Sequence, residues 1–249
     1  MKFVAVIPAR YASTRFPGKP LCMLEGKTMI ERVYEQVCKN PHFAHVLVAT
    51  DDSRIFDAVQ AFGGQVLITS SEHRSGTDRV ADAVRQWKDI AQDDVVVNIQ
   101  GDEPFIDPLQ LDELMACFDK EQVQIATLAK PIQSQEILKD PNIVKVVQSN
   151  EGKALYFSRL PIPYLRNKSF ADHIFYQHIG VYAYRMKTLQ EIVQLPTSLL
   201  EQAESLEQLR WIENGYTIYL QITHRETFFG IDTPEDMQKA IEYIRLTNK

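Results

Sequence analysis

The first twenty residues constrain the fold most, because an apolar run leads directly into a loop rich in cations. Phe3–Pro8 is wholly apolar, as expected of a parallel strand that is buried on both faces. The loop that follows contains Arg10, Arg15, Gly18 and Lys19. Cations this close repel one another unless an anion lies between them. Open α/β sheets bind ligands at the carboxyl ends of their strands, so this loop is predicted to hold phosphates. The alternative is a surface loop whose arginines meet only water.

Strand-like and helix-like patterns alternate through the first half of the chain. Strands are expected at 3–8, 44–50, 65–69 and 95–99, and helices at 28–39, 52–62, 77–87 and 108–118. This βα alternation indicates an α/β fold with a mostly parallel central sheet and helices on both faces.

The second half is less regular. Strands are expected at 124–129, 143–148, 154–158, 175–184 and 216–222, helices at 199–214 and 233–247, and a proline-containing loop at 159–173. No flexible linker separates the halves, so a single domain over 1–249 is predicted.

Charge and cysteine content exclude several classes of protein. The formal net charge is −6, which argues against general nucleic-acid binding and makes the local cations of the first loop a site for a specific anion. Three cysteines without Cys-x-x-Cys spacing indicate neither a disulfide framework nor a zinc site. We find no basic and apolar leader and no apolar run near the roughly 20 residues of a membrane span. We therefore expect a cytoplasmic protein that does not enter a membrane.

The cationic loop is not a common phosphate motif. It has neither Gly-x-Gly-x-x-Gly nor Gly-Lys-Ser/Thr, so side-chain cations replace much of what backbone amides do in those loops. Ser13 and Thr14 add short hydrogen-bond donors. This arrangement suits a triphosphate whose leaving pyrophosphate gains negative charge during transfer.

A carboxylate follows the predicted strand at 95–99, in Asn98-Ile-Gln-Gly-Asp-Glu-Pro104. Asp102 falls at the same sheet edge as the cationic loop. Mg²⁺ prefers hard oxygen ligands and often binds one or two carboxylates together with phosphate oxygens. Asp102 is therefore predicted to bind Mg²⁺; the alternative is a turn that Asp102 caps.

A second carboxylate, Asp232, lies in Ile231-Asp-Thr-Pro-Glu-Asp236. Thr233 and Asp236 can form a capping box at a helix start, with Pro234 as its first residue. That alternative leaves Asp232 unexplained, so Asp232 is predicted to be a second metal ligand.

The segment Ser75-Gly-Thr-Asp-Arg79 opens a predicted helix. Ser75 can cap the helix and Asp78 can lie in its first turn, where the dipole favours a carboxylate. Equally, Ser75 and Gly76 can line a nucleotide. The spacing alone does not decide between these interpretations.

Taken in order, these motifs resemble the 3-deoxy-manno-octulosonate cytidylyltransferases (CMP-Kdo synthetases) over nearly the whole chain. The matching segments are Ile7–Leu21, Val48–Asp51, Ser75–Arg79, Asn98–Pro104, Tyr156–Arg159, His178–Tyr182, Leu206–Arg210 and Gly230–Asp236. The first motif alone would indicate only a nucleotidyltransferase.

The resemblance implies a Rossmann-like nucleotidyltransferase fold with a smaller acceptor and dimerisation subdomain. It implies a Mg²⁺-dependent reaction in which CTP and Kdo, an eight-carbon 2-keto sugar acid, give CMP-Kdo and pyrophosphate for lipopolysaccharide synthesis. It assigns nucleotide binding mainly to 1–130, acceptor binding and homodimer contacts to 131–225, and a metal ligand and closing helix to 226–249.

The resemblance also implies roles for particular residues. CTP would contact Ala9, Arg10, Ser13, Arg15, Lys19, Ser75, Gly76, Gln100 and Asp102. The catalytic groups would be Arg10, Lys19 and the metal-binding Asp102 and Asp232. Kdo would contact Gln100, Arg159, His178, Tyr182, Glu207 and Gln208. On the residues alone, His178 and Tyr182 could instead be core residues, and Glu207 and Gln208 could face solvent.

Three alternatives remain from the sequence. A cytidylyltransferase for another acid sugar, such as sialic acid, would share the phosphate loop; Gln100, Arg159 and the 206–210 segment favour Kdo. A glycosyltransferase would usually carry an Asp-x-Asp motif near the end of a central strand, which we do not find. A non-catalytic nucleotide-binding regulator would need neither Asp232 nor Arg159.

Overall fold

The computed structural model describes residues 1–12, 16–226, 230–231 and 233–247. The chain divides into two compact units, Met1–Asp112 with Glu226–Lys249, and Glu113–Arg225. No helix in the described part is both long and apolar enough to cross a membrane.

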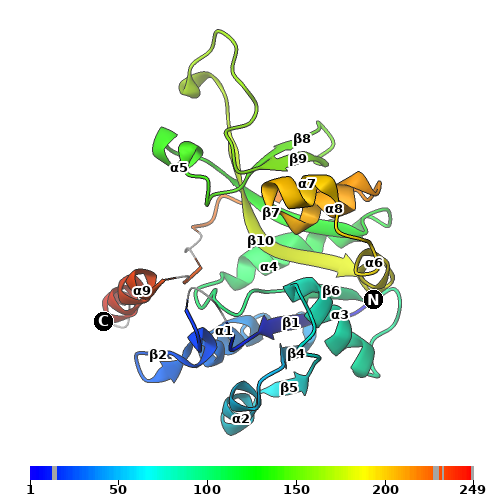
Figure 1. The fold of residues 1–249 in the computed structure, drawn as a ribbon, viewed down its shortest axis with the longest axis vertical. Helices are drawn as coiled ribbons and strands as arrows, with labels where there is room; N and C mark the ends of the chain where they lie inside the picture. Colours follow the sequence, from blue (N-terminus) through cyan, green and yellow to red (C-terminus); the bar gives the residue numbers. More distant parts are fainter. Residues whose placement is uncertain (13–15, 227–229, 232, 248–249) are drawn as a thin grey trace. The chain divides into compact units, whose positions relative to one another are not determined.

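The first unit is a parallel sheet with helices packed against it (Figure 1). Its elements are β1 (Phe3–Ala9), η1 (Lys19–Leu21), β2 (Met23–Leu24), β3 (Lys27–Thr28), α1 (Met29–Cys38), β4 (Phe43–Thr50), α2 (Ser53–Ala61), β5 (Gln65–Ile68), α3 (Gly76–Gln86), β6 (Val95–Asn98) and α9 (Pro234–Thr247). Helix α4 (Pro108–Met115) contains the boundary between the units.

Strand β1 is the centre of this sheet. It pairs in parallel with β4 on one side and β6 on the other, and β5 pairs with β4. Val4 to Ile7 are fully buried, as the apolar run predicts. Because the chain leaves β1 first toward β4 and later returns to β6, the sheet has a topological switch point between β1 and β6. A ligand site is expected at the carboxyl ends of those two strands.

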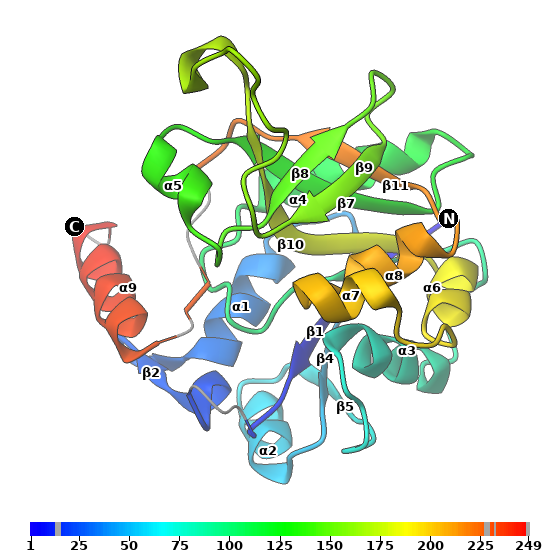
Figure 2. The same cartoon turned by 45° about the horizontal axis from the view of Figure 1, so that its top comes forward.

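The second unit is a mixed sheet with short helices (Figure 2). Its elements are η2 (Ala116–Asp119), β7 (Ile125–Pro131), α5 (Gln135–Lys139), β8 (Lys145–Gln148), β9 (Ala154–Ser158), η3 (Phe170–Asp172), β10 (Tyr176–Arg185), α6 (Met186–Ile192), α7 (Leu199–Glu204), α8 (Glu207–Glu213) and β11 (Ile218–Ile222). Strand β7 pairs in parallel with β11 and antiparallel with β10, and β8 pairs antiparallel with β10 and β9. The predicted α/β class is confirmed.

The single helix predicted at 199–214 is wrong. Ser205 adopts a left-handed conformation, with φ of 52°, and separates α7 from α8. Its N–H donates to the Glu201 carbonyl, which closes the first helix. Leu199 is 80% exposed and so lies outside any apolar stripe. Because neither Gly nor Pro marks the break, the sequence gives no sign of it.

Candidate active site

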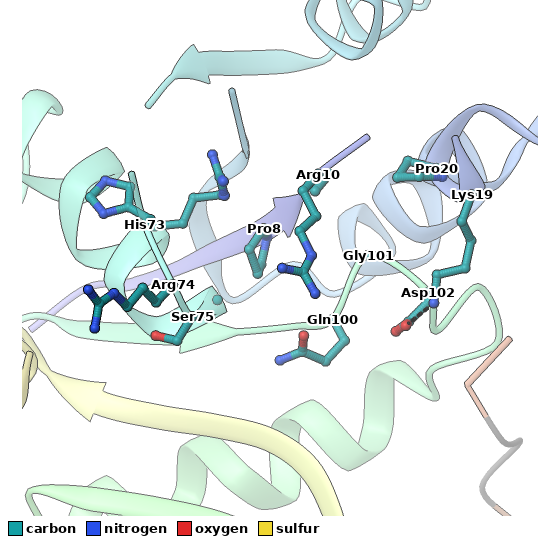
Figure 3. A pocket seen from close by; sticks show the side chains of 13 residues that line it. Pro8, Arg10, Lys19, Pro20, His73, Arg74, Ser75, Gln100, Gly101 and Asp102 are labelled. Carbon is teal, nitrogen blue, oxygen red and sulfur yellow. Dashed lines mark hydrogen bonds and ion pairs between the residues drawn. The ribbon is translucent and has the colours of Figure 1, made fainter. Parts of the chain in front are cut away.

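A cavity of about 360 Å³ opens where β1 and β6 end (Figure 3). All of its lining residues belong to the first unit: Pro8, Ala9, Arg10, Lys19, Pro20, His73, Arg74, Ser75, Gly76, Arg79, Gln100, Gly101 and Asp102. Seven predicted site residues therefore share one cavity: Ala9, Arg10, Lys19, Ser75, Gly76, Gln100 and Asp102. Three others, Ser13, Arg15 and Asp232, lie outside the described residues.

Glycine is required at one point in the cavity wall, Gly101, and at one point in the loop beside it, Gly18. A Cβ at Gly101 would lie 2.9 Å from the Pro8 carbonyl oxygen, so only glycine lets the segment after β6 pass this close to β1. Gly18 has φ of 72°, and a Cβ there would lie 3.1 Å from the Tyr11 ring. These contacts bring the cationic loop and the Asp102 turn to the same edge of the sheet.

The charges in the cavity leave an excess of positive charge. Lys19 Nζ lies 2.6 Å from Asp102 Oδ2, and Arg79 Nη2 lies 3.0 Å from Asp51 Oδ2. Arg10 and Arg74 have no ion-pair partner among the described residues, and Arg10 points into the cavity toward Gln100 (Figure 3). Two unpaired guanidinium groups beside two neutralised pairs favour a ligand with several negative charges.

Both interpretations of Ser75 agree with the structure. Its Oγ accepts from Asp78 N–H at 3.1 Å and its own N–H donates to Asp78 Oδ2 at 3.2 Å, which is a capping box. At the same time Ser75 and Gly76 line the cavity. The start of α3 therefore faces the cavity, where the helix dipole adds to the attraction for an anion.

Asp102 has the properties of a ligand for a hard cation. Its carboxylate lines the cavity and is part-exposed beside Lys19. The chain returns to it late in the sequence: Ile231 N–H donates to the Asp102 carbonyl at 3.0 Å, and a Cβ at Gly230 would lie 3.7 Å from Asp102 Oδ1. Burial and the Asp102 charge raise the pKa of the neighbouring Glu103 to about 8. The described residues contain no cluster of three or more candidate metal ligands.

The capping box predicted at the start of α9 is present. Thr233 N–H donates to Asp236 Oδ2 at 3.1 Å, and Asp236 N–H donates to Thr233 Oγ1 at 3.2 Å. These bonds account for Thr233 and Asp236, as the alternative interpretation of this motif requires.

Arg159 lies at the end of β9 in the second unit. Its guanidinium donates to three carbonyl oxygens, those of Glu204 at 2.7 Å, Pro141 at 3.0 Å and Ser205 at 3.3 Å. Neutral acceptors orient the group without neutralising its charge. Arg159 is therefore a fixed cation, as a carboxylate site requires.

His178 and Tyr182 lie near each other on β10, with ring centroids 5.2 Å apart. His178 Nε2 lies 3.0 Å from Thr127 Oγ1, and the single Thr127 proton goes to the Val181 carbonyl at 2.7 Å. Nε2 is therefore the protonated nitrogen, and Nδ1 is an acceptor. The Tyr182 hydroxyl is buried without a hydrogen-bond partner among the described residues, and burial raises its pKa.

Glu207 and Gln208 begin α8. Gln208 is only 6% exposed, so the solvent-facing alternative is wrong for it. Glu207 Oε1 accepts from Arg210 Nη2 at 2.7 Å, and Arg210 also lies 3.2 Å from Glu201. An Arg210-centred network thus holds the start of α8, which explains why these side chains do not follow a simple helical stripe.

Acid conditions should destabilise the protein through His178. Burial lowers the pKa of this imidazole to about 3, whereas an unfolded histidine has a pKa of about 6.5. Below pH 6.5 the unfolded chain therefore binds a proton that the folded chain does not. As a result, the free energy of unfolding decreases as the pH is lowered. In denaturant melts at pH 7 and pH 5, we expect His178→Gln to lose less stability than the wild type. Equal losses would contradict a buried neutral His178.

Sequence reasoning missed several residues of the two units. In the cavity these are His73, Arg79 and Gly101. Arg79 and Gly101 lie in the motifs 75–79 and 98–104, but neither was predicted to have a role in the site. In the second unit they are Lys145 and Glu204, which contact Arg159. The glycine and arginine could have been found from their motifs, whereas a lysine bound to backbone carbonyls leaves no pattern in the sequence.

The fold and this cavity are those of a nucleotidyltransferase. Within that class, residues 4–222 match the model of the cytidylyltransferase family. The chain is 56% identical to the 3-deoxy-manno-octulosonate cytidylyltransferase of Parabacteroides distasonis, with 98% of each chain covered. It therefore belongs to the 3-deoxy-manno-octulosonate cytidylyltransferases.

A solved structure and a second relative extend the comparison. A CMP:2-keto-3-deoxy-manno-octonic acid synthetase complexed with CTP superposes with a TM-score of 0.92 at 43% identity, covering 99% of this chain and 100% of the other. A relative from Shewanella piezotolerans, 46% identical with 96% of each chain covered, is an 8-amino-3,8-dideoxy-manno-octulosonate cytidylyltransferase.

Proposed function

We propose that this protein transfers the cytidylyl group from CTP to Kdo, giving CMP-Kdo and pyrophosphate. The observation that carries the proposal is the cavity at the β1–β6 switch point, in which Lys19 and Asp102 form a pair and Arg10 has no ion-pair partner among the described residues. Family membership specifies the reaction, and CMP-Kdo would serve lipopolysaccharide synthesis in the cytoplasm. The odd number of cysteines and the lack of Cys-x-x-Cys spacing favour a reducing compartment.

The first unit would bind CTP. Arg10 and Lys19 neutralise charge that accumulates on the leaving pyrophosphate. The wall at the start of α3 and the end of β1 would hold the rest of the nucleotide, through Ala9, Ser75, Gly76 and Gln100. Ser13 and Arg15 complete the proposed set from the same loop. Positioning and charge neutralisation suffice for an in-line transfer without a covalent enzyme intermediate.

Asp102 and Asp232 would hold Mg²⁺. When bound, the metal supplies positive charge at the α-phosphate and lowers the pKa of the attacking Kdo 2-hydroxyl. Asp102 fits this role because its oxygens are hard ligands at the cavity wall and because Gly230 and Ile231 lie against it. Lys19 orients the same carboxylate from the side of the phosphate loop.

The acceptor would be bound largely by the second unit. Arg159 would bind the Kdo carboxylate. The Tyr182 hydroxyl, for which the described part of the chain supplies no hydrogen-bond partner, and the His178 Nδ1 acceptor would bind sugar hydroxyls, together with Gln100, Glu207 and Gln208. Because His178 stays neutral, it contributes a hydrogen bond and not a charge.

The protein would act as a homodimer. The second unit exposes Leu160, Tyr164 and Ile174 by 69%, 88% and 60%, and a partner subunit could cover these apolar side chains. A single-chain mass in sedimentation equilibrium, at concentrations used for assay, would contradict this assignment.

Pyrophosphate release tests the proposed reaction. Parallel reactions with CTP and Mg²⁺ should contain Kdo, 8-amino-3,8-dideoxy-manno-octulosonate, sialic acid or no acceptor. We expect release with Kdo and only background release without an acceptor. Preference for the amino sugar or for sialic acid would keep the nucleotide site and change the acceptor. CTP binding without release in any reaction would favour the non-catalytic regulator.

A further inference from the structure

Lys145 is a fully buried lysine at the start of β8. Its Nζ donates to the carbonyls of Ile143 at 2.6 Å, Asp140 at 2.9 Å and Arg159. These bonds use all three ammonium protons. Burial lowers its pKa, and no carboxylate lies within ion-pair distance in the part of the chain that the structure describes. Lysine is rarely buried without an ion pair, so this placement requires a reason.

Glu204, the last residue of α7, binds the same segment from the other side. Its Oε2 accepts from Arg159 N–H at 2.9 Å, and its Oε1 accepts from Ser158 Oγ at 2.7 Å. The backbone of Arg159 is thus fixed at both ends: a carboxylate binds its N–H and an ammonium binds its carbonyl. Charge-assisted bonds of this kind are stronger than neutral ones.

The two charged groups also fix the acceptors of the guanidinium. Pro141, whose carbonyl accepts from Arg159 Nη1, lies in the turn that Lys145 holds through residues 140 and 143. The other two acceptors are the carbonyls of Glu204 itself and of Ser205. The three bonds use three of the five guanidinium N–H groups, which leaves one on each terminal nitrogen for a ligand.

We propose that Lys145 and Glu204 are positioning residues that aim the Arg159 guanidinium at the carboxylate of the acceptor. The inference rests on the proposed function, which assigns Arg159 to that carboxylate. Neither residue contacts the ligand; they act by holding the backbone segments that hold Arg159. Neutral carbonyls around the guanidinium preserve its full charge for the anion, while the buried ammonium of Lys145 and the part-buried carboxylate of Glu204 restrict its direction.

Steady-state kinetics of single and double variants test this role. We expect Lys145→Met to raise KM for Kdo about tenfold or more, since a charge-assisted network is lost, with KM for CTP within about twofold. Arg159→Ala should raise KM for Kdo further. In the Arg159→Ala background, adding Lys145→Met should change KM for Kdo little, because both act through one group. Lys187→Met, at an exposed lysine of α6, is the matched control.

The double variant separates positioning from a general structural role. Multiplicative effects of Lys145→Met and Arg159→Ala, or an equal rise of KM for CTP, would overturn the inference alone. If Arg159→Ala left KM for Kdo unchanged, the proposed acceptor site and the inference would both fail. Activity with Kdo in the wild type would then still support the proposed reaction.

A second pair of variants covers the case in which Lys145→Met does not fold. Glu204→Ala removes both side-chain bonds, whereas Glu204→Gln retains an oxygen for Arg159 N–H and an amide for Ser158. We expect Glu204→Ala to raise KM for Kdo about tenfold and Glu204→Gln to restore it to within about threefold of the wild type. Equal effects of the two variants, or no effect of Glu204→Ala, would overturn the inference.

Discussion

Asp102→Asn is expected to lower kcat by about a thousandfold while the protein stays folded and binds CTP. The carboxylate lines the cavity at the carboxyl end of β6 and lies 2.6 Å from Lys19 Nζ. The amide keeps the shape but removes the charge that would hold Mg²⁺, so the largest loss falls on the transition state. Single-turnover pyrophosphate release with saturating CTP and Kdo measures this loss.

Two further measurements identify the cause of that loss. If Asp102 binds Mg²⁺, the variant should need more Mg²⁺ for half-maximal activity, and a chelator should abolish wild-type activity. Asp57→Asn, at an exposed carboxylate of α2, is the matched control and should retain wild-type kcat. Wild-type kcat in Asp102→Asn would leave the carboxylate only its role as partner of Lys19.

The parallel sheet of the first unit could be predicted because each of its four strands has a local signature, whereas the two-residue strands β2 and β3 were missed. Apolar runs such as 3–8 and 95–99 are buried strands, and helices such as α1 follow amphipathic patterns with clear caps. The short helices α5 and α6 were missed because helices of five and seven residues carry too few turns to show a period. The break at Ser205 depends on one backbone conformation that the sequence does not mark.

The candidate site was predictable where it follows directly from strand ends. Arg10 and Asp102 lie just beyond β1 and β6, and topology brings such positions together. The acceptor residues needed the family resemblance, because His178 and Gln208 have sequence contexts that suit a core equally well. Lys145 donates to backbone carbonyls at 140, 143 and 159, and Glu204 accepts from the Arg159 N–H, so only the folded chain shows their relation to Arg159.

Asp232→Asn should lower kcat about as strongly as Asp102→Asn, without lowering the melting temperature. The capping box at the start of α9 uses Thr233 and Asp236, and Ile231 N–H binds the Asp102 carbonyl. The cap therefore does not need Asp232, whereas the chain on its amino side lies against the proposed metal ligand.

Asp236→Asn provides the opposite control in the same six-residue motif. It weakens the cap, so it should cost about 1 kcal/mol of stability while kcat stays near the wild-type value. Thermal melts and pyrophosphate release on both variants give a crossed pattern: Asp232→Asn loses activity and keeps stability, and Asp236→Asn does the reverse. Wild-type turnover in Asp232→Asn would contradict a second metal ligand at this position and leave Asp102 as the proposed Mg²⁺ ligand.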